Sequence, residues 1–208
     1  DHTSETGDIF GIYNSCTNQN ARIEYNELDL RNYLIDSNDG TYGDIWGITA
    51  HNSLISNNII SIDNLHDNSS SNRERIYPIR GSSSYITNNS ITMIKSRYNW
   101  CDNNDSWAIE SYRSGENRGY IAYNEIYLLN DAQDNCHRFN GIKSEFATVE
   151  FNEITSNYRS DNWAFNTGNN DTLRNNIATN FSHGINAEND RDIYIENNII
   201  NVECAGVY

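Results

Sequence analysis

The sequence predicts an all-β fold in which short parallel strands stack into a solenoid of about seven rungs. Three observations predict it. Asparagine, which disfavours helix interiors and suits turns, makes up 36 of the 208 residues. Apolar and polar residues alternate over short stretches, as in Ile60-Ser61-Ile62. Above all, one hydrophobic phrase built around an asparagine recurs along the whole chain, which indicates a repeat architecture.

The recurring phrase has an aliphatic residue, two further residues, an asparagine, and a second hydrophobic residue two positions later. Its asparagines are Asn26, Asn58, Asn89, Asn124, Asn152, Asn176 and Asn198. The steps between them are 32, 31, 35, 28, 24 and 22 residues, so loops of variable size follow the asparagine strand. We expect each strand to pair with its equivalent one turn later, and the asparagine amides to form a ladder along the coil.

A second phrase precedes each asparagine and predicts another strand per rung. Its inward residues are Ile12, Ile48, Ile79, Ile109, Ile142, Phe165 and Ile185. The small residue just before each of them should point outward and form a shallow groove. The position two before the inward residue is aromatic in five rungs, as Phe10, Trp46, Tyr77, Trp107 and Trp163. The other two rungs have Asn140 and His183 there. Alternate residues of a strand share one face, so this position should point inward with the aliphatic residue and form an inward aromatic stack. The alternative is an outward stripe of rings that binds sugars.

Charged residues follow the inward aliphatic residue in three successive rungs. Arg80, Glu110 and Lys143 should lie on one face, about 5 Å apart. If the chain is an enzyme, these are its candidate catalytic residues, with cations to stabilise an anionic intermediate and a carboxylate to accept a proton. The other interpretation is an alternating salt-bridge ladder on a solvated sheet.

The charge balance narrows the classes of partner. Lys plus Arg total 14 against 29 Asp plus Glu, a formal net charge of -15 that disfavours nucleic acid, anionic membranes and acidic polysaccharides. No stretch has the roughly 18 apolar residues of a membrane-spanning helix. The chain opens with a polar run, which indicates a processed or excised segment of a longer chain. We expect an extracellular, cell-surface or envelope location.

The four cysteines are spaced too widely for a zinc site and suit disulfides in an oxidising exterior. Cys101 and Cys136 each lie twelve residues after a ladder asparagine, which predicts a Cys101–Cys136 disulfide between successive rungs. Cys16 and Cys204 belong to opposite ends, about 30 Å apart along the axis. They are either free or bonded between molecules.

The repeat resembles the right-handed parallel β-helix superfamily, which includes pectate lyases, phage tailspikes and many bacterial and archaeal surface proteins such as sheath and adhesin-like proteins. The resemblance covers residues 7–207 and implies one domain, 1–208, with a single-stranded right-handed parallel β-helix. It does not transfer catalytic residues, because the paired aspartates of the family's polygalacturonases are absent. No cofactor is expected; acidic loops at 102–105 and 131–134 are weak calcium candidates, with ordinary solvated loops as the alternative.

The sequence favours a structural or adhesive extracellular protein, a sheath, layer or filament assembled through stacked coils and disulfides. Its partners would be copies of itself or surface glycans, with no nucleic acid and no membrane insertion. The alternative is a polysaccharide lyase or glycoside hydrolase acting in a groove beside Arg80, Glu110 and Lys143.

Overall fold

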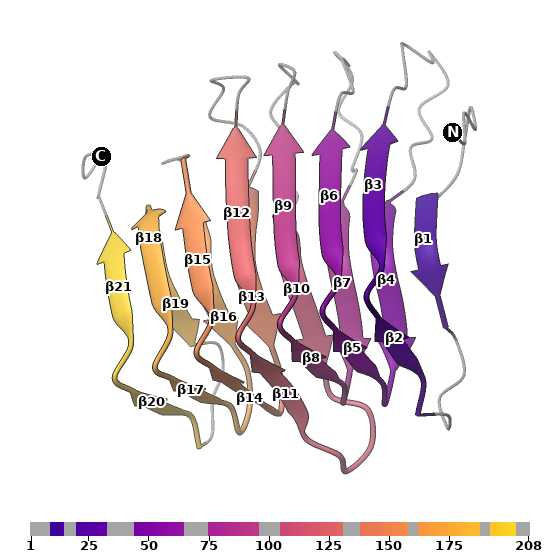
Figure 1. The fold of residues 1–208 in the computed structure, drawn as a ribbon. Helices are drawn as coiled ribbons and strands as arrows, with labels where there is room; N and C mark the ends of the chain where they lie inside the picture. Colours follow the sequence, from indigo (N-terminus) through magenta and orange to yellow (C-terminus); the bar gives the residue numbers. More distant parts are fainter. Residues whose placement is uncertain are drawn as a thin grey trace.

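The structure is a computed structural model that describes residues 9–14, 20–32, 44–64, 75–95, 105–130, 138–157, 162–187 and 192–202. These residues form 21 strands, arranged in three parallel seven-stranded sheets that we call A, B and C. Sheets A and C face each other, and sheet B joins them along one edge (Figure 1). Three consecutive strands, one from each sheet, form one rung.

Every strand pairs in parallel with its equivalents in the neighbouring rungs. Sheet A contains β1 (Ile9–Tyr13), β4 (Ile45–His51), β7 (Ile76–Ser82), β10 (Asp105–Tyr112), β13 (Arg138–Ser144), β16 (Trp163–Thr167) and β19 (His183–Ala187). Sheet B contains β2 (Arg22–Glu24), β5 (Leu54–Ser56), β8 (Tyr85–Thr87), β11 (Gly119–Ala122), β14 (Ala147–Glu150), β17 (Thr172–Arg174) and β20 (Tyr194–Glu196). Sheet C contains β3 (Glu27–Asn32), β6 (Ile59–Asn64), β9 (Ser90–Lys95), β12 (Glu125–Asn130), β15 (Glu153–Ser156), β18 (Ile177–Phe181) and β21 (Ile199–Val202). This arrangement is compatible with a parallel β-helix.

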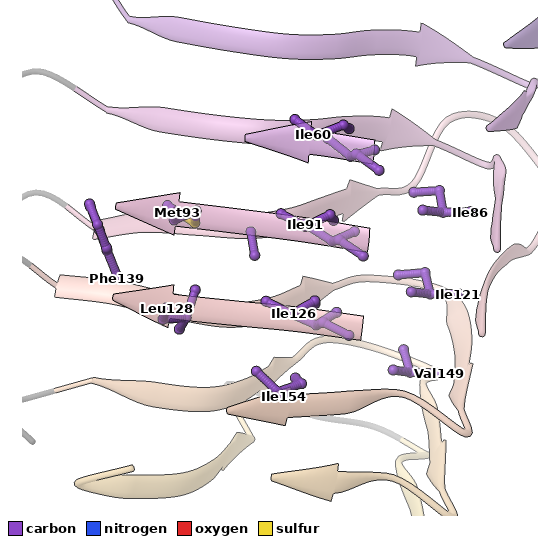
Figure 2. Packing of buried hydrophobic residues seen from close by; sticks show 14 of the residues in the cluster. Ile60, Ile86, Ile91, Met93, Ile121, Ile126, Leu128, Phe139, Val149 and Ile154 are labelled. Carbon is purple, nitrogen blue, oxygen red and sulfur yellow. The ribbon is translucent and has the colours of Figure 1, made fainter. Parts of the chain in front are cut away.

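The core consists of columns of like residues, one or more from each sheet. Strand register places Ile60, Ile91 and Ile126 directly above one another in sheet C, and Figure 2 shows them as one column beside the sheet B column of Ile86, Ile121 and Val149. All six side chains are fully buried. The hydrophobic positions of the recurring phrase are therefore confirmed as core positions in the inner rungs, whereas at the ends Ile195 is exposed and Leu28 and Ile200 are partly buried.

The asparagine ladder is confirmed in all seven rungs. Each side-chain Nδ2 donates to the Oδ1 of the next asparagine at 2.9 Å, in six consecutive hydrogen bonds from Asn26 to Asn198. The same Oδ1 also accepts the backbone N–H of the preceding asparagine, as Asn124 does from Asn89 at 3.0 Å. Because these amides are largely buried, the ladder satisfies groups that would otherwise be costly to bury.

The residue before each ladder asparagine has a left-handed backbone conformation, with φ between 52° and 59°. These residues are Tyr25, Asn57, Asn88, Tyr123, Phe151, Asn175 and Asn197. Four are asparagine, which tolerates this conformation better than other residues with side chains, so these four Asn-Asn pairs mark the corner between sheets B and C. The three aromatic residues adopt it at a steric cost.

Two predictions for sheet A are wrong. Ala108 and Ala164, in the column of small residues predicted to point outward, are fully buried in the core cluster. A Cβ added at Gly141 would lie 2.9 Å from Ile154 Cδ1, so this column faces inward, and the predicted groove of small residues does not exist. The aromatic column, predicted to point inward, lies on the outer face, where the Arg80 guanidinium packs over Trp46.

A bend in each strand of sheet A explains both errors. The register pairs Phe10 with Trp46 and Ile12 with Ile48 but passes over the glycine between them. At this bend the small residue and the following aliphatic residue both face the core, which breaks the strict alternation of a flat strand. A Cβ at Gly47 would lie 2.3 Å from the carbonyl oxygen of Pro78, so the bend brings the backbones of neighbouring rungs close together.

The disulfide predictions fall on residues whose structure is not described. Cys16, Cys101, Cys136 and Cys204 all lie outside the described ranges, as do most of the large loops after the asparagine strands. The Cys101–Cys136 disulfide and the intermolecular role of Cys16 and Cys204 stay predictions. The calcium candidates at 102–104 and 131–134 also lie outside these ranges.

Candidate functional site

The outer face of sheet A brings together the candidate residues of the sequence. Register aligns Arg80 with Glu110 and Glu110 with Lys143, as predicted. Lys143 Nζ lies 3.5 Å from Glu110 Oε1, and Arg80 Nε lies 2.9 Å from Glu110 Oε2, in an ion-pair contact that is not aligned as a hydrogen bond. Two cations thus converge on one carboxylate from the rungs on either side.

This charge arrangement matches the salt-bridge ladder more closely than a general base. A base must direct a free oxygen at the substrate's proton. Here both oxygens of Glu110 contact cations, and the Glu110 side chain is only 12% exposed, against 35% for Arg80 and 45% for Lys143. The trio therefore presents cations to solvent, with the carboxylate beneath them.

The aromatic column forms a floor of stacked rings on the same face, interrupted at Asn140. Trp46 stacks on Phe10 with ring centroids 6.0 Å apart and on Tyr77 at 4.8 Å, and Trp163 stacks on His183 at 4.3 Å. The central rings are closely covered: Trp46, Tyr77 and Trp107 are 8%, 4% and 3% exposed. An outer aromatic stripe exists, as the alternative interpretation holds, but its central rings present almost no face to a sugar.

Arg80 is held by more than its carboxylate partner. Its guanidinium carbon lies 4.7 Å from the ring centroid of Trp46, 5.5 Å from that of Tyr77 and 5.2 Å from that of Tyr112. Such contacts with aromatic faces stabilise a cation and fix its orientation. Arg80 is therefore a positioned group in the centre of the face.

A histidine and a serine missed by the sequence reasoning lie beside Arg80. His51 Nδ1 lies 2.5 Å from Ser82 Oγ, and the Tyr112 hydroxyl lies 3.4 Å from the same nitrogen. Burial, followed by the positive charge of Arg80, lowers the pKa of His51, which favours the neutral imidazole as an acceptor. Ser82 is fully buried, so its hydroxyl is not available to a polymeric substrate.

These residues could have been found by aligning one more column. His51, Ser82 and Tyr112 each lie three residues after the inward aliphatic residue in successive rungs. This column lies two positions beyond that of Arg80, farther from the bend.

A second aromatic surface, also missed, lies on the outer face of sheet B and along its corner with sheet C. We call Tyr85, Tyr120, Tyr123 and Phe151 the sheet B platform. The ring centroids of Tyr85 and Tyr120 are 5.9 Å apart. Tyr123 and Phe151 stack with their ring centroids 5.2 Å apart and an angle of 5° between the ring planes. Unlike the central rings on sheet A, Tyr85, Tyr123 and Phe151 are 57%, 51% and 44% exposed. The platform therefore offers ring faces and edges to solvent.

A buried carboxylate anchors the platform. Glu150 accepts a hydrogen bond from the Tyr120 hydroxyl at 2.7 Å and pairs with Arg174 from the next rung. Burial, followed by the hydrogen bond to Glu150, raises the pKa of Tyr120 to about 12, so its hydroxyl stays protonated and keeps donating. These contacts fix one ring of the platform relative to three rungs.

Another buried carboxyl group, that of Asp171, braces the corner between sheets A and B. It accepts hydrogen bonds from the Ala147 N–H at 2.7 Å, the Ser144 hydroxyl at 2.7 Å and the Gly168 N–H at 3.0 Å. Burial outweighs these donors and raises the pKa of Asp171 to about 6. Its donors come from its own turn and from the preceding rung, so it ties two rungs together, which indicates a structural role.

The described part of the chain contains no cluster of three or more His, Cys, Asp or Glu side chains placed to bind a metal ion. It also contains no helix long and apolar enough to cross a membrane. Comparison with protein-family models, with curated proteins and with solved structures finds no match for this chain. The function must therefore be argued from the two outer faces themselves.

Proposed function

We propose that this chain is a structural or adhesive extracellular surface protein that contacts glycans without chemical turnover. The sheet B platform carries this proposal, because it places one pair of aromatic rings on a sheet and a second pair at its corner, and three of the four rings are exposed to solvent. Sugar rings stack on aromatic faces, and exposed aromatic groups on a soluble protein mark binding surfaces.

The scaffold beneath the platform suits a load-bearing or display role. The proposed fold is a right-handed parallel β-helix, a handedness supported by the strong preference of parallel crossovers. Three parallel sheets and a continuous amide ladder tie each rung to the next. Because each rung contacts only its neighbours, the platform's spacing is set by the stacking distance of about 4.8 Å.

Self-assembly into a sheath, layer or filament is part of the same proposal. Stacked copies would extend the sheets, and Cys16 and Cys204 would link them covalently. Electron microscopy and a non-reducing gel test this part. Ordered polymers that dissociate with reductant support it, and a monomer that is indifferent to reductant contradicts it.

The second candidate function is a polysaccharide lyase or glycoside hydrolase on sheet A. The meeting of Arg80, Glu110 and Lys143, with His51 close to Arg80, favours it. The buried aromatic floor and the doubly contacted carboxylate weigh against it.

One experiment separates the two candidates. The purified chain is incubated with a panel of soluble polysaccharides, and both retention on the polysaccharide and release of new chain ends are measured. The adhesive proposal expects retention without new ends. Chain cleavage that disappears in the folded triple variant R80A/E110A/K143A would instead establish the enzyme.

A further inference from the structure

We infer that a pocket at the corner between sheets A and B, next to Tyr85 and Tyr120, binds a neutral oligosaccharide. This inference rests on the proposed glycan-contact function and specifies its site and ligand class. The pocket has a volume of about 550 Å³, within the range of sites that hold small ligands. Its lining includes Asn20, Arg22, Asn52, Ser83, Tyr85 and Asn117.

A connection longer than the tight two-residue turns of the neighbouring rungs forms one wall of this pocket. Strands β10 and β11 are joined through residues 113–118, whereas β7 and β8 are joined by two residues only. Gly115, with φ of 78°, allows the turn. The connection is fixed to the neighbouring rung because the Ser83 hydroxyl donates to the Ser114 carbonyl at 2.9 Å and accepts from its N–H at 3.2 Å.

The end of the same connection is anchored in the opposite direction. The Arg118 guanidinium donates to the Ala147 carbonyl at 2.9 Å and to the Thr148 and Thr172 hydroxyls at 3.0 and 2.9 Å. Arg113 and Arg118 also pack over the Phe146 ring, at 4.8 and 5.6 Å from its centroid. The wall is thus tied to rungs on both sides, which gives the pocket a preorganised shape.

The pocket combines the two kinds of group that recognise a sugar. Asn20, Asn52 and Asn117 supply amide side chains that donate to and accept from hydroxyl groups. Tyr85 supplies an exposed ring, and the ring of Tyr120 lies beside it, held by Glu150. A pyranose stacked on Tyr85 would direct its hydroxyls into the amide-lined pocket, and further sugars would follow the platform along the rungs.

The charges favour a neutral ligand. The described residues lining the pocket include no carboxylate and two arginines, Arg22 and Arg118. Arg22 pairs with Glu24 at 2.7 Å, and Arg118 makes the three hydrogen bonds given above. The chain's net charge of -15 repels polyanions at long range. A polyuronate would therefore have to approach these arginines against the field of the whole chain, whereas a neutral oligosaccharide meets no such repulsion.

Affinity electrophoresis tests the site. Wild-type protein is run through gels containing a β-glucan, a mannan or a xylan, with polygalacturonate as the anionic probe. Tyr85→Ala is expected to weaken binding to the retained neutral polysaccharide about tenfold or more, as for a central aromatic contact. The matched control is Tyr127→Ala, because Tyr127 is also exposed but lies on the outer face of sheet C. It should leave the affinity unchanged.

The outcomes distinguish failure of the pocket proposal from failure of the glycan-contact function. Binding that survives Tyr85→Ala, with the variant's melting temperature unchanged, overturns the pocket but leaves glycan contact intact. Stronger retention by polygalacturonate than by every neutral polysaccharide overturns the ligand class. Failure of the wild-type protein to bind any of the four overturns the glycan-contact function itself. Asn117→Ala, in the loop wall, provides a second variant and should weaken binding without altering the β-sheet circular dichroism.

Discussion

Replacing the central ladder asparagine by leucine should destabilise the fold far more than the same change at the first rung. Asn124 is fully buried. Its Oδ1 accepts from both the backbone N–H and the Nδ2 of Asn89, at 3.0 and 2.9 Å. Its Nδ2 donates to Asn152 Oδ1 at 2.9 Å and to the Ile86 carbonyl at 2.9 Å. Leucine has similar size but replaces none of these bonds.

The magnitude follows from the groups left unpaired. The Asn89 backbone N–H loses its partner, while the Asn89 Nδ2 keeps its bond to the Ile55 carbonyl at 3.0 Å. An unsatisfied buried polar group costs about 1–3 kcal/mol, so one full and several partial losses give about 2–4 kcal/mol. Asn26→Leu removes only donations, from a half-buried side chain, and should cost about 1 kcal/mol.

Urea denaturation followed by tryptophan fluorescence measures both variants. The free energy of unfolding of Asn124→Leu should fall clearly below that of Asn26→Leu, with an unchanged slope against urea concentration. Equal destabilisation by the two substitutions would refute the argument, because it would mean that the ladder contributes as single local contacts rather than through shared buried amides. A slope that changes would indicate loss of cooperativity along the rungs instead.

Three further predictions follow from the bends, the corners and the buried carboxyl group. Gly141→Val should destabilise the fold by about 3 kcal/mol or more, because even its Cβ would lie 2.3 Å from the Ala164 carbonyl oxygen. The control Gly184→Ala should be tolerated, because its Cβ would meet only side-chain carbons at 3.2 Å or beyond. Equal melting temperatures of the two variants would contradict this prediction. Tyr25→Asn should raise the free energy of unfolding by about 1 kcal/mol, because Tyr25 is exposed and has φ of 59°, and a loss of stability in chemical denaturation would show that its ring makes an unrecognised contact. The pKa of Asp171 is raised in the folded state to about 6, so its contribution to stability is full at pH below about 4 and is lost as the pH rises through 6. Asp171→Asn should therefore flatten the dependence of the free energy of unfolding on pH in this range. An unchanged pH dependence in the variant would exclude Asp171 as its source.

The sequence was sufficient for the register because the ladder imposes a strict spacing. Each asparagine must reach the next amide, so its neighbours at fixed offsets align in every rung whatever the length of the intervening loop. Arg80, Glu110 and Lys143 were placed together by a different marker, their position directly after the inward aliphatic residues Ile79, Ile109 and Ile142. Their distances to the next ladder asparagine are 9, 14 and 9 residues, so the ladder alone would not have aligned them.

The direction of the side chains in sheet A could not be obtained by counting alternate positions. The bend at the glycine column, where Gly47 approaches the Pro78 carbonyl, reverses the face of every residue before it. The sheet B platform was missed for another reason: Tyr123 and Phe151 precede ladder asparagines, where the repeat indicates only a turn. Their left-handed backbone directs them to the outer surface.

The amide ladder gives the rod a chemical polarity. All six amide-to-amide bonds run in the same sense, with each Nδ2 directed toward the rung that follows in the sequence. A rung added at either end must continue this sense, because two copies related by a two-fold axis would bring donor to donor or acceptor to acceptor. Any growth through the ladder is therefore head-to-tail, and its geometry is that of an open filament rather than a closed dimer.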